Sequence, residues 1–220
     1  MSSGSRKLYR DWCGRYHVTN WFPLALGMDV PPGTAAPARL CGKEIALWRG
    51  TDGQIHAWED RCPHRGMRLS FGFVRNGNLA CLYHGWQFGA DATCRHIPAH
   101  PELRVPGTIH AHAYRAEERA GIIWVSLNEK ASADELPNMD AFGARSILIR
   151  APLASVRTAL ALPDEGWGWQ EDCLVAVHEP EPGLTMLHMA AATLARRLDV
   201  ADRAKITRDR LEALKEKVPA

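Results

Sequence analysis

The sequence predicts a mainly β protein, an antiparallel β-sandwich followed by a short α+β segment that ends in two helices. Short runs rich in β-branched and aromatic residues recur along the first 128 residues, and turn signals containing Gly or Pro separate them. Beyond that point the composition becomes polar and alanine-rich, and apolar residues then recur at intervals of three and four. We therefore expect a β domain over residues 1–130, a linker and a strand over 131–150, and an α-rich region over 151–220.

The strands of the first half are predicted from local signals. Residues 9–30 alternate aromatic and small side chains, which favours an opening strand and a loop. Residues 43–58 form two apolar runs on either side of Asp52-Gly53, a tight-turn pair, and this pattern predicts a hairpin. The second run leads directly into Cys62.

Further strands are predicted on both sides of a second ligand-bearing loop. Asn76-Gly77 is another tight-turn pair, so the segment that reaches Cys81 is expected to be a returning strand. Residues 86–98 favour two strands around a turn, and the run from Ile122 to Leu127 is the strongest strand signal in the chain.

The C-terminal part mixes both kinds of signal. Residues 128–146 are polar and broken by Pro137, which indicates a linker, and residues 147–160 favour a strand followed by a short helix. Cys173 to Val177 predicts one more strand. Two helices are then predicted from residues spaced by three and four, the second beginning at Asp199 and Asp202: Leu184, Leu187, Ala191, Leu194 and Leu198, and then Val200, Ala204, Thr207, Leu211, Leu214 and Val218.

Composition narrows the class of protein. Hydrophobic residues make up 46% of the 220 residues and charged residues 24%, which is typical of a globular protein with a core. The net charge is +2 and no run of five like charges occurs, so nothing favours nucleic-acid binding. The N-terminus lacks an apolar stretch after its basic residues, and no apolar run approaches a membrane span. We expect no membrane association and a cytoplasmic location.

The six cysteines are expected to be reduced thiols and metal ligands, because no export signal is visible. Four of them lie outside any ligand pattern and are interpreted as small buried apolar residues: Cys13, Cys41, Cys94 and Cys173.

The chemistry-bearing motif is Cys62-x-His64 followed by Cys81-x-x-His84. Each of two short loops offers one thiolate and one imidazole. Such loops can hold a two-iron, two-sulfide cluster, with both cysteines on one iron and both histidines on the other. Zinc is the alternative metal, since it also binds two cysteines and two histidines, but zinc sites usually pair like ligands, whereas each loop here mixes them.

The spacing and the flanking residues of both loops resemble the Rieske [2Fe-2S] family; the flanks are Pro63, Arg65 and Gly66 in the first loop and Tyr83, Gly85 and Trp86 in the second. The resemblance covers about residues 9–128 and implies a Rieske-type β-sandwich with the cluster held by two hairpin loops. It implies the ligands Cys62, His64, Cys81 and His84. Around them, Pro63 would stiffen its loop, the two glycines would let amides approach the sulfurs, and Trp86 would shield the cluster from water.

Within that family the chain resembles the N-terminal Rieske domain of ring-hydroxylating and other non-haem iron oxygenase subunits. Neither loop carries an additional cysteine, no serine follows His84, and stretches such as CLYHGWQF and GIIWVSL follow the habits of that branch. The resemblance implies a second domain in which two histidines and a carboxylate hold a mononuclear Fe(II).

The C-terminal part departs from that pattern. Only His178 and His188 follow residue 128, and Asp172 or Glu179 would have to be the third ligand. The part is also short for a catalytic domain, so a mononuclear Fe(II) is not expected, and the region is interpreted as the remnant of such a domain.

These observations lead to a main functional hypothesis and two alternatives. The chain is expected to carry single electrons from an NAD(P)H-dependent flavin or iron–sulfur reductase to an oxygenase subunit. The first alternative is a terminal oxygenase subunit, an aromatic-ring hydroxylase or oxidative demethylase, with a reduced catalytic domain. The second is a cluster-bearing regulatory or assembly subunit whose terminal helices bind a partner. No catalytic residue is identified, and oligomerisation is left open.

Overall fold

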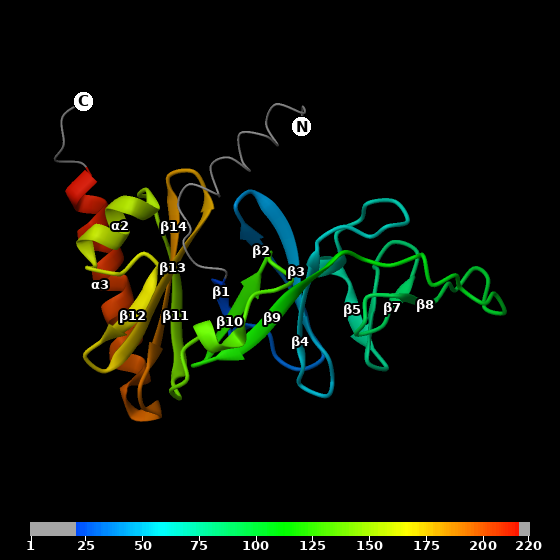
Figure 1. The fold of residues 1–220 in the computed structure, drawn as a ribbon, viewed down its shortest axis with the longest axis horizontal. Coiled ribbons are helices and arrows are strands. Elements are labelled where there is room, and N and C mark those ends of the chain that lie inside the picture. The colour runs from blue at the N-terminus through cyan, green and yellow to red at the C-terminus, as the bar shows by residue number, and fades with distance from the viewer. Residues whose placement is uncertain (1–20, 216–220) are drawn as a thin grey trace.

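The computed structural model describes residues 21–215, which form three sheets in a row with two helices at one end (Figure 1). We call these the main sheet, the loop sheet and the C-terminal sheet. Four short 3-10 turns connect other elements: η1 Gly27–Asp29, η2 Leu69–Phe71, η3 Ala133–Glu135 and η4 Leu194–Arg196. No helix within the described part of the chain is long and apolar enough to cross a membrane.

The main sheet lies in the middle of the molecule and is entirely antiparallel. Its strand order is β1-β10-β9-β4-β3-β2. The bounds are β1 Phe22–Leu26, β2 Ala35–Leu40, β3 Lys43–Arg49, β4 Ile55–Glu59, β9 Ala113–Arg119 and β10 Ile122–Ser126. The hairpin predicted around Asp52-Gly53 is present, and Gly53 takes the positive φ (85°) that such a turn needs.

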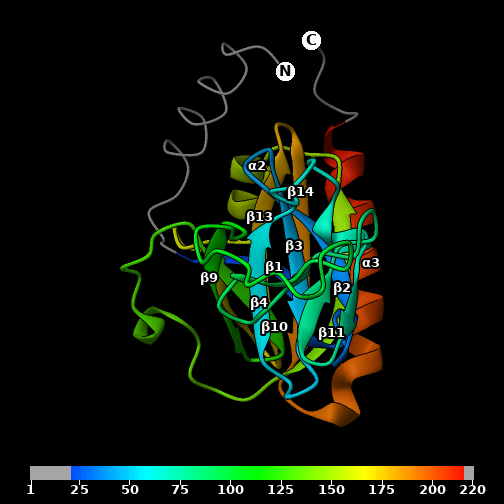
Figure 2. The same ribbon diagram turned by 90° about the vertical axis from the view of Figure 1, so that its right-hand side faces the viewer.

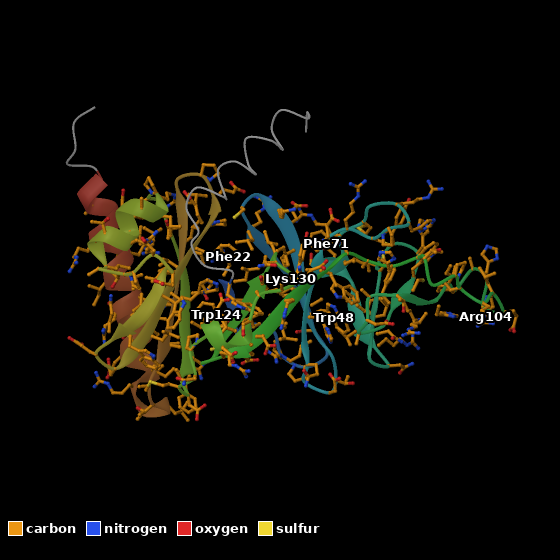
Figure 3. The ribbon with its side chains drawn as sticks, viewed as in Figure 1. Phe22, Trp48, Phe71, Arg104, Trp124 and Lys130 are labelled. Atoms are coloured by element: carbon orange, nitrogen blue, oxygen red, sulfur yellow. The ribbon has the colours of Figure 1, made fainter. Side chains whose placement is uncertain are left out.

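The loop sheet begins after the first ligand-bearing loop and contains the second. It contains β5 Phe73–Arg75, β6 Asn78–Ala80, β7 Gln87–Phe88 and β8 Cys94–His96 in sequential antiparallel order. The turn between β5 and β6 is the predicted Asn76-Gly77 turn, with positive φ at both residues. Trp48, labelled in Figure 3, and Trp58 of the main sheet pack edge to face. Trp58 in turn packs edge to face with Phe88 of the loop sheet. These aromatic contacts join the two sheets.

The C-terminal sheet has the order β11-β14-β13-β12, with β11 Phe142–Ile149, β12 Trp167–Gln170, β13 Cys173–Glu181 and β14 Leu184–Ala191. Its outer face packs on α2 Leu153–Ala159 and α3 Arg197–Lys215, and Figure 2 shows α3 running lengthwise beside the strands. Its inner face packs on the main sheet, where Leu174 and Ala190 lie in one apolar cluster with Trp124. Both faces of this sheet are therefore covered.

The mainly β fold with a short α+β C-terminal part is confirmed, but the two expected terminal helices are one. The stretch from Leu184 to Ala191, which predicted the first helix, is the strand β14, and only α3 is helical. Because β14 is buried on both faces, its apolar residues form a nearly continuous run, and spacing alone does not distinguish such a strand from a helix. Three strands and two helices thus lie beyond residue 150, where mostly helix was expected.

The cysteines outside the ligand motif behave in two ways. Cys94 and Cys173 are buried free thiols, as expected. Cys41 is disulfide-bonded, so the expectation of a reduced thiol is wrong at this position. Cys13 and the first part of the predicted opening strand lie outside the described residues.

Candidate metal centre

The first ligand loop leaves β4 and folds back on itself. The amide of Cys62 donates to the carbonyl of Met67 (2.8 Å), and the amide of Gly66 donates to the carbonyl of Cys62 (2.8 Å). Gly66 has a φ of +75°, a conformation that glycine adopts without strain. This closed turn points the amides of His64 and Arg65 at the Cys62 sulfur, where both act as hydrogen-bond donors.

The second loop repeats the same turn after β6. The amide of Cys81 donates to the carbonyl of Trp86 (2.9 Å), and the amide of Gly85 donates to the carbonyl of Cys81 (3.0 Å). Gly85 has a φ of +69°, and a Cβ at this position would lie 3.0 Å from Cγ of Pro98. The loop that follows β8 therefore supports the second ligand loop from outside.

The four predicted ligands come together at one end of the molecule. Cys62 and Cys81 are each only 2% exposed and belong to the apolar cluster beneath the loop sheet, whereas His64 and His84 are exposed. The two imidazole rings are 4.7 Å apart between centroids and tilted by 60°. The site thus has a buried sulfur side and an exposed nitrogen side.

Electrostatics at the centre favour neutral ligands in the absence of a metal. Burial raises the pKa of the Cys62 thiol to about 12; the amides of His64 and Arg65 oppose this, while the neighbouring Cys81 adds to it. The pKa of His64 is lowered, by loss of hydration and then by the nearby His84 and Arg65. A neutral imidazole is the form that binds metal, and a buried thiolate needs positive charge beside it, such as iron.

Aromatic side chains cover both imidazoles. Trp86 stacks on His64 with centroids 4.3 Å apart and planes 5° apart, and Tyr83 stacks on His84 at 3.8 Å and 30°. Trp86 was expected to shield the cluster from water. In the structure it fixes the ring of His64 and packs with the apolar cluster below, whereas Tyr83 is exposed.

Two residues that sequence reasoning missed anchor the first loop. The buried carboxylate of Asp60 accepts hydrogen bonds from the amide of Ser70 (2.7 Å) and from its hydroxyl (2.6 Å). This pair ties the start of the loop that carries Cys62 to η2. In the sequence, the only local sign of this contact is an acid two residues before a ligand cysteine, and that sign does not identify Ser70 as the partner of Asp60.

The donor set fits a two-iron cluster. Two adjacent thiols lie on the inner side, two adjacent imidazoles lie on the outer side, and amide donors point at sulfur. A [2Fe-2S] cluster needs only two protein ligands at each iron. Among residues 21–215, no group of three or more His, Cys, Asp or Glu side chains is placed to hold a single metal ion.

The residues considered for a second iron are not assembled as a triad. His178 and His188 do meet between the C-terminal and main sheets. Their rings are parallel within 7°, and Nε2 of His188 lies 3.3 Å from Nδ1 of His178. The other nitrogen of His188 contacts Ser146 Oγ (2.8 Å), and that of His178 contacts the carbonyl of Arg39 (3.1 Å). Both imidazoles are therefore engaged in hydrogen bonds.

The proposed third ligands lie elsewhere. Asp172 immediately precedes the first residue of β13. Its carboxylate accepts hydrogen bonds from Arg196 (2.7 Å) and Arg203 (2.6 Å), and these arginines hold its pKa below the usual value. Glu179 is buried and accepts a hydrogen bond from the amide of Gly183. Since a strand advances about 3.3 Å per residue, Asp172, which immediately precedes β13, lies roughly 20 Å from His178 along this strand.

Comparisons with known proteins agree with the chemistry of the loops. Residues 20–107 match the protein-family model described as the Rieske [2Fe-2S] domain. The chain is 38% identical over 113 residues to the oxidoreductase NdmD of Pseudomonas putida, covering 51% of this chain and 19% of that protein. It is 32% identical over 123 residues to the oxygenase subunit of 3-chlorobenzoate-3,4-dioxygenase of Comamonas testosteroni. This match covers 54% of this chain and 28% of that protein. The chain thus spans less than a third of the length of these two relatives.

The likeness in fold extends further than the likeness in sequence. The crystal structure of apo dicamba monooxygenase matches with a TM-score of 0.73 at 16% identity, over 92% of this chain and 88% of that chain. At this identity the match concerns the arrangement of strands and helices.

Proposed function

We propose that the chain, whose residues 20–107 are a Rieske [2Fe-2S] domain, is an electron-transfer component of a Rieske non-haem iron oxygenase system. In this role it takes single electrons from an NAD(P)H-dependent flavin or iron–sulfur reductase and passes them to an oxygenase subunit. The observation that supports this most directly is the pair of exposed imidazoles, His64 and His84, set above two buried thiols at one end of the molecule.

The residues of the centre have distinct tasks. A bound [2Fe-2S] cluster supplies one-electron oxidation and reduction. Cys62 and Cys81 hold its inner side against the apolar core, where the amides of the first loop stabilise charge on sulfur. His64 and His84 hold its outer side, and replacing two thiolates by neutral imidazoles favours the reduced state. We expect a potential in the lower half of the range of about −150 to +300 mV.

The test is metal and sulfide analysis of the full chain purified without oxygen. Two irons and two sulfides per chain are expected, with an absorbance spectrum that dithionite bleaches. Cys81→Ser should remove the cluster. Cys94→Ser is the matched control, because Cys94 is a buried free thiol of the same apolar cluster, and its thiol donates to the carbonyl of His96 (3.8 Å). Zinc without sulfide, or a cluster that survives Cys81→Ser, would contradict the proposal.

A catalytic subunit is the second candidate, because the fold likeness to a monooxygenase continues through the C-terminal sheet. A third iron per chain, lost on changing His188, together with oxygen uptake that depends on an added substrate, would favour this candidate. Two irons and no such uptake favour the electron carrier.

A further inference from the structure

An open hollow of about 250 Å³ lies beside the first ligand loop. Arg61, His64 and Arg65 line it from the loop, and His110 and His112 line it from the segment that leads into β9. All five side chains are exposed. The hollow therefore combines two guanidinium groups and three imidazoles, and one of these imidazoles belongs to the metal centre.

The two arginines are not neutralised by the protein. Within residues 21–215, no carboxylate lies within 4.0 Å of the guanidinium of Arg61 or Arg65. Nearby arginines are paired: Arg68 binds Glu44, and Arg95 binds Asp91 at 2.6 Å. The Arg61 side chain lies against the loop, with its Nε 3.4 Å from the position a Cβ of Gly66 would take. Two uncompensated positive charges thus flank His64.

The single acidic residue that lines the hollow does not cancel them. This residue is Glu59, and its charge also acts on Tyr114, whose pKa is raised to about 12, first by burial and then by that charge. Tyr114 in turn packs edge to face with His112 at 4.8 Å. The Glu59 carboxylate forms no ion pair with Arg61 or Arg65, so two guanidinium groups stand against one carboxylate at the hollow.

We propose that this hollow receives a carboxylate side chain from an acidic electron-transfer protein, which docks over the first ligand loop with His64 at the contact. The inference rests on the proposed function. Charge complementarity identifies the occupant, because guanidinium groups bind carboxylates and no acid among residues 21–215 forms an ion pair with Arg61 or Arg65. Exposed Leu82 and Tyr83 on the second loop add the apolar contact that a protein partner uses.

The location also favours a protein over a small molecule. The hollow is open and is lined by the first ligand loop and by the segment that leads into β9. Arg104, in the loop before that segment, lies at the end of the molecule opposite the helices (Figure 3). Positive charge at a protruding end steers an acidic partner and raises its association rate by about 10 to 1,000-fold, and the effect falls with ionic strength.

The experiment measures electron transfer into the cluster-loaded full chain by stopped-flow absorbance. The probe is a reduced plant-type [2Fe-2S] ferredoxin, an acidic carrier whose potential lies well below the Rieske range. The variants are Arg61→Glu and Arg65→Glu. The matched control is Arg75→Glu on β5, since Arg75 is exposed, does not line the hollow and changes the net charge by the same amount.

The second-order rate constant should be at least about tenfold lower in each hollow variant than in Arg75→Glu. In the unaltered chain it should fall as the ionic strength rises from about 0.01 to 0.2 M. Reduction by dithionite should be equal in all forms. Equal ferredoxin rates for Arg61→Glu, Arg65→Glu and Arg75→Glu, or no fall with salt in the unaltered chain, would overturn the proposal.

Two controls separate the possible failures. If a glutamate variant lacks the cluster spectrum, Arg61→Gln and Arg65→Gln are compared with Arg75→Gln, and the salt dependence of the unaltered chain decides independently. An unaltered chain without a dithionite-reducible cluster would refute the proposed function. A normal cluster with unchanged ferredoxin rates would refute only the docking site.

Discussion

Acidification should loosen the contact between the C-terminal and main sheets through the buried pair of His178 and His188. The carbonyl of Arg39 can only accept, so the Nε2 of His178 carries a proton and its Nδ1 accepts from Nε2–H of His188. The Nδ1 of His188 then accepts from the hydroxyl of Ser146. Both imidazoles are neutral in this arrangement, and because His188 is buried, a further proton on it would place a positive charge in a buried site next to His178.

The loss of stability on acidification follows from the pKa of His188, which is held well below its usual value of 6.5. Burial is the main cause and the neighbouring His178 adds to it, while the carbonyl of Pro23 acts in the opposite direction. The unfolded chain therefore binds a proton below pH 6.5 that the folded chain does not bind. The contribution of His188 to stability is constant above pH 6.5 and falls below it, by at most about 1.4 kcal/mol per pH unit while the pH stays above the folded-state pKa.

The assay is urea unfolding followed by tryptophan fluorescence at pH 7.5 and pH 5.0. Trp124 and Trp167 face each other across the same sheet contact, with centroids 5.9 Å apart, and report on it. His188→Gln should lower stability at pH 7.5 but shrink the difference between the two pH values, by at most roughly 2 kcal/mol. His100→Gln, in an exposed loop, is the control and should leave the difference unchanged. A His188→Gln variant with the full pH difference would refute the reasoning.

Two further substitutions test how the ligand loops are held. Gly85→Ala should destabilise the second loop by about 1–3 kcal/mol and speed cluster loss measured by absorbance, because φ is +69° and the new Cβ would press on Pro98 at 3.0 Å. Gly77 also has a positive φ (+74°) but has open space around it, so Gly77→Ala should cost only the free energy of backbone strain and should retain the cluster. Equal cluster loss in Gly77→Ala and Gly85→Ala would contradict the role of Pro98. Ser70→Ala should cost about 1–3 kcal/mol in urea unfolding, since it leaves the buried carboxylate of Asp60 with one fewer donor, and an unchanged midpoint would show that the loop is held otherwise.

The sequence predicted the parts of the structure that depend on neighbours in the chain. Local turn residues predict the hairpins at Gly53 and Gly77, and the spacing of cysteine and histidine predicts the two ligand loops. Both loops close through hydrogen bonds within six residues, so the turn itself is encoded locally.

The remaining features depend on contacts between distant segments. The strand β14 was mistaken for a helix because its burial on both faces is a property of the assembled sheets. Asp60 and Ser70, ten residues apart, become partners only once η2 folds back on the loop. His178 and His188 were considered as iron ligands, and their mutual hydrogen bond follows from the pairing of β13 with β14. Spacing along the chain reveals neither contact.

The row of three sheets places the metal centre and α3 at opposite ends of the molecule (Figure 1). This separation suits oriented attachment to a surface. Leu198 on α3 is 80% exposed, so Leu198→Cys gives a thiol handle far from His64 and His84. A chain anchored there on an electrode would present its imidazole side to the solution. Voltammetry in that orientation would measure the midpoint potential while a dissolved partner still has free access to the first ligand loop.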